Sequence, residues 1–210
     1  MTVRTDNTLN VPESDVIYSQ VPTAENVMDV FKLATGAEII HGMNWYRDAH
    51  DIAGRIANGD YVAGAGVLAA LSPMMGWGRN VELAEKAFAD GKASGGLKRN
   101  LEKSNRIMSG ENPLDVLGGD KVRNFYLAIL DPENSIGVVI DRHAFDIAVG
   151  EVTNDKTRGY LSRKGKYEMF SHVYVEAAEM ISLELGTKIS GCQLQAITWV
   201  AWRRLKGIND

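Results

Sequence analysis

The sequence predicts an all-α protein, and three observations carry this prediction. Apolar residues recur at three- and four-residue steps along most of the chain, which is the period of an amphipathic helix. Gly, Pro and polar capping residues divide these stretches into segments of helical length. A single run, residues 136–140, has the length and composition of a buried strand, and one strand cannot form a sheet.

Each expected helix follows from apolar spacing, from a Gly or Pro stop and from a polar cap. Residues 167–186 show the apolar pattern most clearly, and Gly186 ends that helix. The last helix opens with Ser190 and Gln193, a reciprocal capping box. In chain order, the expected helices span about 23–34, 38–58, 61–71, 77–90, 97–108, 121–131, 142–149, 167–186 and 191–205.

The composition is that of a globular chain, with 45% hydrophobic and 24% charged residues, 21 Gly and 5 Pro among 210 residues. A chain of this length buries roughly 70% of the surface that it exposes when unfolded, so it needs no disulfide or metal to hold it together. Its one cysteine, Cys192, cannot form an internal disulfide, a structural zinc site or an iron–sulfur cluster. A lone thiol is typical of a reducing compartment.

We expect a flexible N-terminal arm at residues 1–22 and a single helical domain of two lobes at residues 23–210. The loop at about 151–165 is the only segment that resembles a boundary between lobes. No stretch reaches the roughly 18 apolar residues of a membrane span, and the polar start lacks the apolar core of a signal peptide. These features predict a cytoplasmic protein without a membrane partner.

Charge is unevenly distributed along the chain. The formal net charge of −4 argues against indiscriminate binding to polyanions. Residues 1–60 carry four Lys or Arg against nine Asp or Glu. Cations gather in two later segments, which contain Lys92, Lys98, Arg99, Lys103 and Arg106, and Lys156, Arg158, Arg163, Lys164 and Lys166. Each segment is either a binding surface or a solvated face.

A Gly-Gly hairpin at Gly118 and Gly119 separates a short expected helix from a longer one. Glycine permits a positive φ and a close backbone approach, and the N–H groups that open the next helix at Lys121 form its positive end. Such a helix start can bind a phosphate without a side chain. The alternative is an ordinary helix–helix turn with a glycine C-cap.

Two motifs stand in order within residues 60–150. The first reads Gly66-Val-Leu-Ala-Ala-Leu-Ser-Pro-Met-Met-Gly-Trp-Gly-Arg-Asn-Val-Glu-Leu-Ala. The second reads Leu117-Gly-Gly-Asp-Lys-Val-Arg-Asn-Phe and continues, after a loop, with Val139-Ile-Asp-Arg-His. Together they resemble the helix-hairpin-helix DNA glycosylase superfamily of endonuclease III-like proteins, with the helix-hairpin-helix at about residues 113–131.

This resemblance implies a two-lobed helical fold whose partner is DNA, double-stranded and with one base flipped into a pocket between the lobes. It implies no obligatory protein partner and no cofactor, since N-glycosidic cleavage requires none. The missing cysteines mean that the iron–sulfur cluster of some relatives is absent. The departures from housekeeping motifs suit a phage or mobile-element relative acting in the host cytoplasm, and they leave the target base open among uracil, a damaged purine and a hypermodified pyrimidine.

Carried over residue by residue, the resemblance makes Asp141 the catalytic carboxylate, which would stabilise the cationic sugar as the base leaves. The alternative role of Asp141 is a plain helix N-cap, and both roles are compatible. Lys121 stands where bifunctional members carry a Schiff-base lysine, and its alternative role is a phosphate contact. The residues expected to contact DNA are Gly118, Gly119, Lys121, Arg123, Arg142 and Lys164, and the expected base pocket contains Trp77, Met74 and Tyr46.

Core packing is the alternative role for several pocket candidates. Met74 and its neighbour Met75 are at least as well explained as buried core residues. A helical face that either lines the base pocket or packs in the core contains His41, Trp45, Tyr46 and His50. His143 matches the histidine after the family's aspartate, where we expect a structural hydrogen bond. The scattered histidines predict no metal site.

Three functions are compatible with these patterns. The first is an enzyme that flips a base and cleaves, or exchanges at, its N-glycosidic bond. The second is a catalytically inactive helix-hairpin-helix module that binds DNA and uses Asp141 only as a cap. The third is a protein-binding helical domain, which would suit the acidic first sixty residues.

Overall fold

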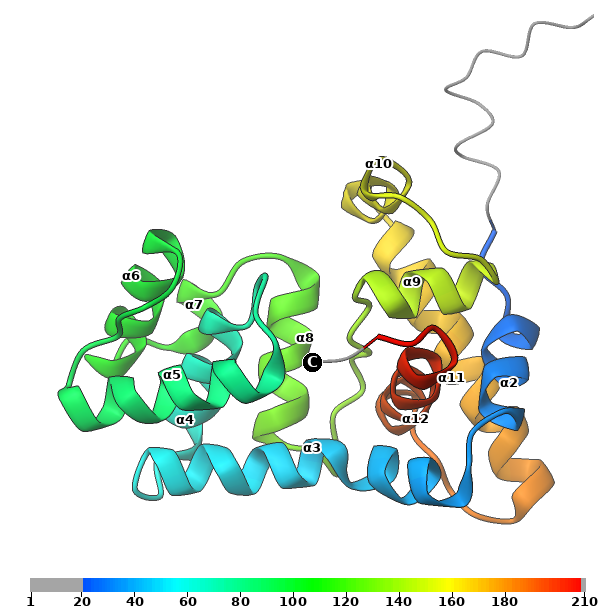
Figure 1. Ribbon diagram of the computed structural model, residues 1–210, viewed down its shortest axis with the longest axis horizontal. Helices are drawn as coiled ribbons and strands as arrows, with labels where there is room; N and C mark the ends of the chain where they lie inside the picture. The colour runs from blue at the N-terminus through cyan, green and yellow to red at the C-terminus, as the bar shows by residue number, and fades with distance from the viewer. Residues whose placement is uncertain (1–20, 209–210) are drawn as a thin grey trace, which may run out of the picture.

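A computed structural model gives the structure of residues 21–208. Within that range the chain is helical throughout and contains no strand, which confirms the all-α prediction. The predicted N-terminal arm, apart from its last two residues, lies outside the described residues. The helices of Figure 1 are α2 (Ala24–Lys32), α3 (Gly36–Ile56), α4 (Tyr61–Leu71), α5 (Trp77–Asp90), α6 (Lys98–Met108), α7 (Pro113–Val116), α8 (Asp120–Leu130), α9 (Arg142–Val149), α10 (Asp155–Arg158), η1 (Gly159–Ser162), α11 (Lys166–Leu185) and α12 (Gly191–Leu205).

Every helix expected from the apolar pattern is present, with ends that agree within two residues. The pattern did not predict α10 and η1, since four-residue helices are too short to show an apolar period. The run 136–140 forms no strand in the described chain. Instead, the Tyr167 hydroxyl accepts a hydrogen bond from the Ile140 N–H at 2.9 Å and donates one to the Val138 carbonyl at 2.8 Å.

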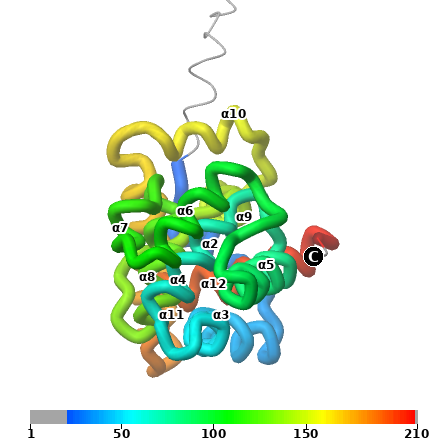
Figure 2. The backbone as a smooth tube through the Cα atoms, turned by 90° about the vertical axis from the view of Figure 1, so that its left-hand side faces the viewer, coloured from blue at the N-terminus to red at the C-terminus, as the bar shows by residue number. Residues whose placement is uncertain are grey.

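Two hydrophobic cores divide the helices into two lobes. The terminal lobe consists of α2, α9, α11 and α12, and it buries Phe145 and Tyr174 completely. The central lobe consists of α4 to α8 with the second half of α3, and it buries Leu68 and Ile129. The chain therefore begins in the terminal lobe, builds the central lobe and returns. Figure 2 looks at the molecule from the side of the central lobe, with α3 below and α10 above.

The prediction of a lobe boundary at 151–165 is wrong. That loop joins α9 to α11, and both helices belong to the terminal lobe. The chain crosses between the lobes along α3 and again through residues 131–141. The polar composition of the loop marks a solvent-exposed segment, whereas the first crossing occurs inside a continuous helix that has no break in composition.

Helix α3 is fixed to both lobes by close helix–helix contacts. In the central lobe it lies against α4, which is buried on nearly all sides from Gly64 to Leu71. A Cβ at Gly64 would overlap the Ala53 carbonyl of α3. At the opposite end of α3, a Cβ at Gly42 would overlap the backbone of Ile197 in α12. The two lobes are therefore held together along α3, and a junction forms between α8, α9 and α12 (Figure 1).

Candidate functional site

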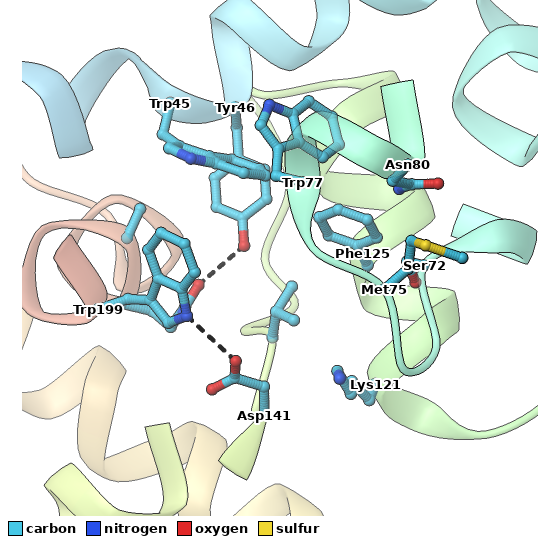
Figure 3. A pocket seen from close by; sticks show the side chains of 13 residues that line it. Trp45, Tyr46, Ser72, Met75, Trp77, Asn80, Lys121, Phe125, Asp141 and Trp199 are labelled. Atoms are coloured by element: carbon cyan, nitrogen blue, oxygen red, sulfur yellow. Dashed lines mark hydrogen bonds between the residues drawn. The ribbon is translucent and has the colours of Figure 1, made fainter. Parts of the chain in front are cut away.

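A cavity of about 130 Å³ lies at the junction of the two lobes (Figure 3). Helices α3, α5 and α8 form one side of it, and α12 and the residues before α9 form the other. The lining residues are Trp45, Tyr46, Ser72, Met75, Trp77, Asn80, Lys121, Phe125, Val139, Asp141, Gln195, Ala196 and Trp199. The site thus combines residues from widely separated parts of the chain.

Aromatic rings form most of the cavity wall. The Trp45 ring lies at the centre of the group, with its centroid 4.9 Å from those of Tyr46 and Trp77, 6.0 Å from Phe125 and 6.3 Å from Trp199. Apolar cavities of about 150 Å³ bind benzene, so a cavity of this size can accept one planar ring. The tilted and edge-on orientations of the rings are those that aromatic groups prefer.

Asp141 stands at the edge of the cavity as the N-cap of α9. Its Oδ1 accepts hydrogen bonds from the backbone N–H groups of His143, at 2.9 Å, and Ala144, at 2.8 Å. Its Oδ2 accepts from the Trp199 indole N–H at 3.2 Å, which Figure 3 marks with a dashed line. The helix-cap role expected from the sequence is therefore present. Because three donors hold the half-buried carboxylate, its orientation toward the cavity is fixed.

Lys121 faces Asp141 across one rim of the cavity, from the first turn of α8 (Figure 3). Its side chain is exposed and forms no ion pair with another described residue. Helices α8 and α9 both begin at this rim. The N–H groups at the start of α9 already bind the Asp141 carboxylate, so it is the start of α8 and the Lys121 ammonium that favour an anion such as a phosphate at the cavity mouth.

Neutral polar side chains also line the cavity, among them Tyr46, Asn80 and Gln195. The Tyr46 hydroxyl donates to Gln195 Oε1 at 2.8 Å, and burial raises the pKa of Tyr46 well above its ordinary value, so the phenol stays neutral. This bond leaves the NH₂ group of Gln195 available to a ligand. Asn80 donates to the Leu68 carbonyl at 3.0 Å, and its buried Oδ1 has no partner among the described residues. The cavity therefore offers a hydrogen-bond donor beside its aromatic wall, whereas Asn80 Oδ1 is sealed from it.

Of the three residues expected in the base pocket, Trp77 and Tyr46 line this cavity and Met74 does not. Met74 is 92% exposed and has a left-handed backbone, with φ of 64°, in the turn between α4 and α5. That conformation directs its side chain to solvent, and Met75 lines the cavity instead. The expectation that Met74 is a buried core residue is therefore wrong.

The hairpin forms where it was expected, immediately before α8. Gly119 is the N-cap with a φ of 79°, a conformation that favours glycine, and no side chain caps the helix. Gly118 precedes it and borders a separate cavity. Arg123, Arg142 and Lys164 are all exposed, as DNA contacts would be, but none of them lines the aromatic cavity.

The basic segment at residues 156–166 is less available for binding than its charge suggests. Arg158 forms an ion pair with Asp146 at 2.8 Å, with side chains only 18% and 3% exposed. The Lys166 ammonium lies 5.0 Å from the centroid of the Tyr160 ring, within range of a cation–π interaction. Part of this segment therefore stabilises the terminal lobe.

The histidines lie outside the aromatic cavity. His143 is buried, and that burial is the main reason its pKa is lowered. The His50 ring stacks on Tyr61 at 4.3 Å, and its Nδ1 lies 2.9 Å from the Ile129 carbonyl oxygen. His41 borders a wider neighbouring groove. Of the predicted face of histidine and aromatic residues, only the two aromatic residues reach the cavity.

The cavity residues that were not singled out from the sequence include Phe125, Gln195 and Trp199. Phe125 follows Lys121 by four residues, and that spacing, which places both on one face of α8, could have identified it. A buried tryptophan N–H needs an acceptor, so Trp199 was itself a signal of a nearby polar group. No sequence pattern connects Gln195 with Tyr46, which lies 149 positions earlier.

Within residues 21–208, no group of three or more His, Cys, Asp or Glu could hold a metal ion. The same part of the chain has no helix that is long and apolar enough to cross a membrane. The side chains that line the cavity at the junction provide a carboxylate, an ammonium group, amides and aromatic rings.

Comparison with known proteins gives a family and no characterised relative. No curated protein and no solved structure matches the chain significantly. A family model matches residues 13–206, which is nearly the entire sequence. The chain therefore belongs to that family, which is described as a family of unknown function (DUF7178).

Proposed function

We propose that this protein is a helix-hairpin-helix DNA glycosylase-like enzyme, which accepts a flipped base between its lobes and cleaves the N-glycosidic bond of that base. The observation that carries the proposal is Asp141, a carboxylate held by three hydrogen bonds at the edge of an aromatic cavity. The resemblance over about residues 60–150 supports it, because the catalytic aspartate of the resembled superfamily falls on the same residue.

The cavity suits a base that has left the DNA stack. Extruding a base costs roughly a few kcal/mol, which stacking and hydrogen bonding in the pocket must offset. Trp45, Trp77 and Phe125 provide aromatic surface, and the NH₂ group of Gln195 provides a donor to a ring nitrogen or carbonyl. The hairpin before α8 lies at the same rim, where it can contact the sugar–phosphate backbone.

In the proposed reaction, the bond between C1′ of the sugar and the base nitrogen breaks, and its electron pair leaves with the base. The Asp141 carboxylate stabilises the positive charge that develops on the sugar. A water molecule adds to C1′ and gives up a proton, while the departing base takes up a proton. The products are the free base and an abasic site.

Lys121 permits a second route through the same site. As a neutral amine it can attack C1′ in place of water and form an imine with the opened sugar, which borohydride reduces to a stable amine. Its position across the rim from Asp141 supports this role. Its exposure and its place beside the hairpin support the alternative, a phosphate contact without covalent chemistry.

A second candidate function is a helix-hairpin-helix module that binds DNA without cleaving it. The observation in its favour is that both oxygens of Asp141 already accept hydrogen bonds, as those of a purely structural cap can. A protein-binding domain, the third possibility from the sequence, would bind its partner with little of the steep salt dependence of DNA binding.

The decisive experiment measures free bases by mass spectrometry after incubation with deaminated, damaged and phage-modified DNA. Wild type is compared with Asp141→Asn, which keeps the cap acceptor and removes the charge. A borohydride trap is run in parallel with wild type and Lys121→Gln.

A released base that disappears in Asp141→Asn supports the enzyme and names its substrate. A borohydride adduct that is lost in Lys121→Gln adds lyase activity. If no base is released from any DNA, while salt-sensitive DNA binding survives Asp141→Asn, the module without catalysis is the correct function.

A further inference from the structure

A second cavity, of about 280 Å³, lies beside the hairpin and shares no residue with the aromatic cavity. Its lining residues are Ala70, Pro73, Arg99, Asn100, Lys103, Gly118 and Val122. We infer that this cavity binds a phosphate of the DNA backbone through Arg99 and Lys103 of α6, Asn100 between them and the start of α8. The inference rests on the proposed function only for the source of the phosphate, and it does not require base cleavage.

The two cations are arranged on one side of α6. Arg99 and Lys103 are four residues apart, which places both on the face that borders the cavity. Neither forms an ion pair with another described residue, whereas Arg106 of the same basic segment is paired with Glu111 at 2.6 Å. No acidic residue lines the cavity. The positive charge of these two side chains is therefore available to a ligand.

Asn100 provides an independent indication of a ligand. Its side chain is only 5% exposed, borders this cavity and makes no hydrogen bond with another described residue. Buried side-chain amides nearly always have a hydrogen-bond partner. The polar atoms of this amide are not sealed from solvent, so they open into the cavity. A phosphate oxygen there would accept from the Asn100 NH₂ group.

The start of α8 completes the site. The Lys103 Nζ lies 3.8 Å from the position that a Cβ of Gly118 would occupy, so the ammonium sits directly against the hairpin. No side chain caps α8, which leaves the N–H groups of its first turn for an external acceptor. Two cations, one neutral donor and the positive end of a helix therefore converge on one cavity.

A backbone phosphate suits this cavity better than a base or a protein carboxylate. The lining contains no aromatic residue on which a base could stack. The hairpin is shared with the rim of the aromatic cavity, so a strand whose base enters that cavity has phosphates near this one. The basic segment from Lys92 to Arg106 thus acquires a role through only two of its five cations.

The test is the salt dependence of duplex DNA binding, measured by fluorescence anisotropy between 50 and 300 mM NaCl. Arg99→Ala and Lys103→Ala are compared with the matched control Lys98→Ala, which removes the same charge from a side chain of α6 that is 93% exposed and outside the cavity. Each site variant should lower the slope of log K against log salt by about 1 and weaken binding by about 5- to 10-fold at 0.1 M salt. The control should change the slope by less than half as much.

Asn100→Ala should weaken binding without changing the slope, because it removes a donor and no charge. Thermal unfolding of each variant shows whether it is folded. Inorganic phosphate should compete with the duplex in wild type and lose that effect in the Arg99→Ala, Lys103→Ala double variant. If inorganic phosphate binds more tightly than the duplex, the ligand is free phosphate and the assignment to DNA is overturned.

Slopes for Arg99→Ala and Lys103→Ala that equal the slope of the Lys98→Ala control would overturn the site. Wild type that binds duplex DNA without salt dependence would overturn it as well. Absence of base release alongside the expected slopes contradicts the proposed enzyme and supports this site. Base release with unchanged slopes contradicts this site alone.

Discussion

Helix α9 carries two aspartates five positions apart, and their surroundings differ completely. Asp141 begins the helix, is half-buried and presents Oδ2 to the Trp199 indole at the edge of the cavity. Asp146 is 2% exposed, and its carboxylate bonds the Arg158 guanidinium together with the backbone N–H and hydroxyl of Thr153. Both carboxylate oxygens of Asp146 are therefore bonded to groups within the protein.

Residue type and position on a helix therefore do not decide what a carboxylate does. A largely buried ion pair such as Asp146 with Arg158 stabilises one packing arrangement, because removing either partner leaves an unpaired and largely buried charge. A capping carboxylate at a cavity mouth is equally rigid but keeps one edge toward a ligand. Asp141 is therefore the aspartate from which we expect an effect on activity, and Asp146 the one from which we expect an effect on stability.

Of all the substitutions, Asp141→Asn should change activity most, by lowering the rate of base release. The rate should fall by about 10³-fold in single-turnover assays, because the charge that stabilises the sugar cation is removed. The melting temperature should change little, since asparagine caps helices as well as aspartate does. Asp141→Ala, which also removes the cap, should in addition lose about 1 kcal/mol of unfolding free energy. An Asp141→Asn protein that releases bases at the wild-type rate contradicts the catalytic assignment.

Next in size is the loss of stability in Asp146→Ala. It should lower the free energy of unfolding by about 3 kcal/mol, the lower end of the range for broken buried pairs, because Arg158 keeps some contact with water. Urea denaturation measures this change, and the folded fraction should release bases at the wild-type rate. If Asp146→Ala is as stable as wild type, or if its folded fraction releases bases more slowly, the two aspartates do not differ in the way we propose.

Trp199→Phe tests whether the orientation of the Asp141 carboxylate matters for activity. It removes the indole N–H that orients Oδ2 while keeping an aromatic ring in the wall. We expect base release to slow by about tenfold, the loss of one hydrogen bond to a charged group, with unchanged DNA affinity. Trp199 is thus a positioning residue. A change in affinity instead of rate would mean that it contacts the base and does not orient Asp141.

The smallest effect concerns a third carboxylate, Glu38, which pairs with Arg204 at 2.7 Å at the protein surface. The hydrogen bond from Arg204 is the main cause that lowers the pKa of Glu38 from 4.5 to about 2. A lowered pKa stabilises the folded state above about pH 4.5, and this contribution disappears as the pH falls toward 2. Glu38→Gln keeps the capping box of α3 and should cost less than about 1 kcal/mol at pH 7.

At pH 2, Glu38→Gln and wild type should unfold with similar free energies, because Glu38 is then about half protonated in the folded protein and the ion pair has lost most of its contribution. Denaturation curves of the two proteins at pH 7 and pH 2 give the comparison. A difference that is constant with pH would mean that packing, and not the ion pair, accounts for the effect of this substitution.

Local interactions explain why so much of the fold could be predicted. The capping box of Ser190 and Gln193 is present, and so is the Asp141 cap, because each connects residues within three positions. The Gly-Gly hairpin is where it was expected, since the positive φ of Gly119 is a local requirement. These features need no knowledge of the partner helices.

The site could be predicted only in part. Trp77 and Tyr46, expected together in one pocket, both line the cavity, whereas the left-handed backbone of Met74 leaves Met75 to line it. Periodicity reports that a residue is apolar and faces inward, and it does not report whether that face meets a packed core or a cavity. For the same reason Phe125 could be assigned only after its neighbours were known.

The all-α class, the bounds of the long helices, their caps and the hairpin could be predicted from the sequence, because these features depend on contacts within a few residues. The tertiary structure alone decided that two lobes share α3, and that α12 brings Trp199 to Asp141, 58 positions away. It also decided that Asp146 is paired while Asp141 borders a cavity. Such long-range contacts depend on how whole helices pack, and no local pattern encodes that packing.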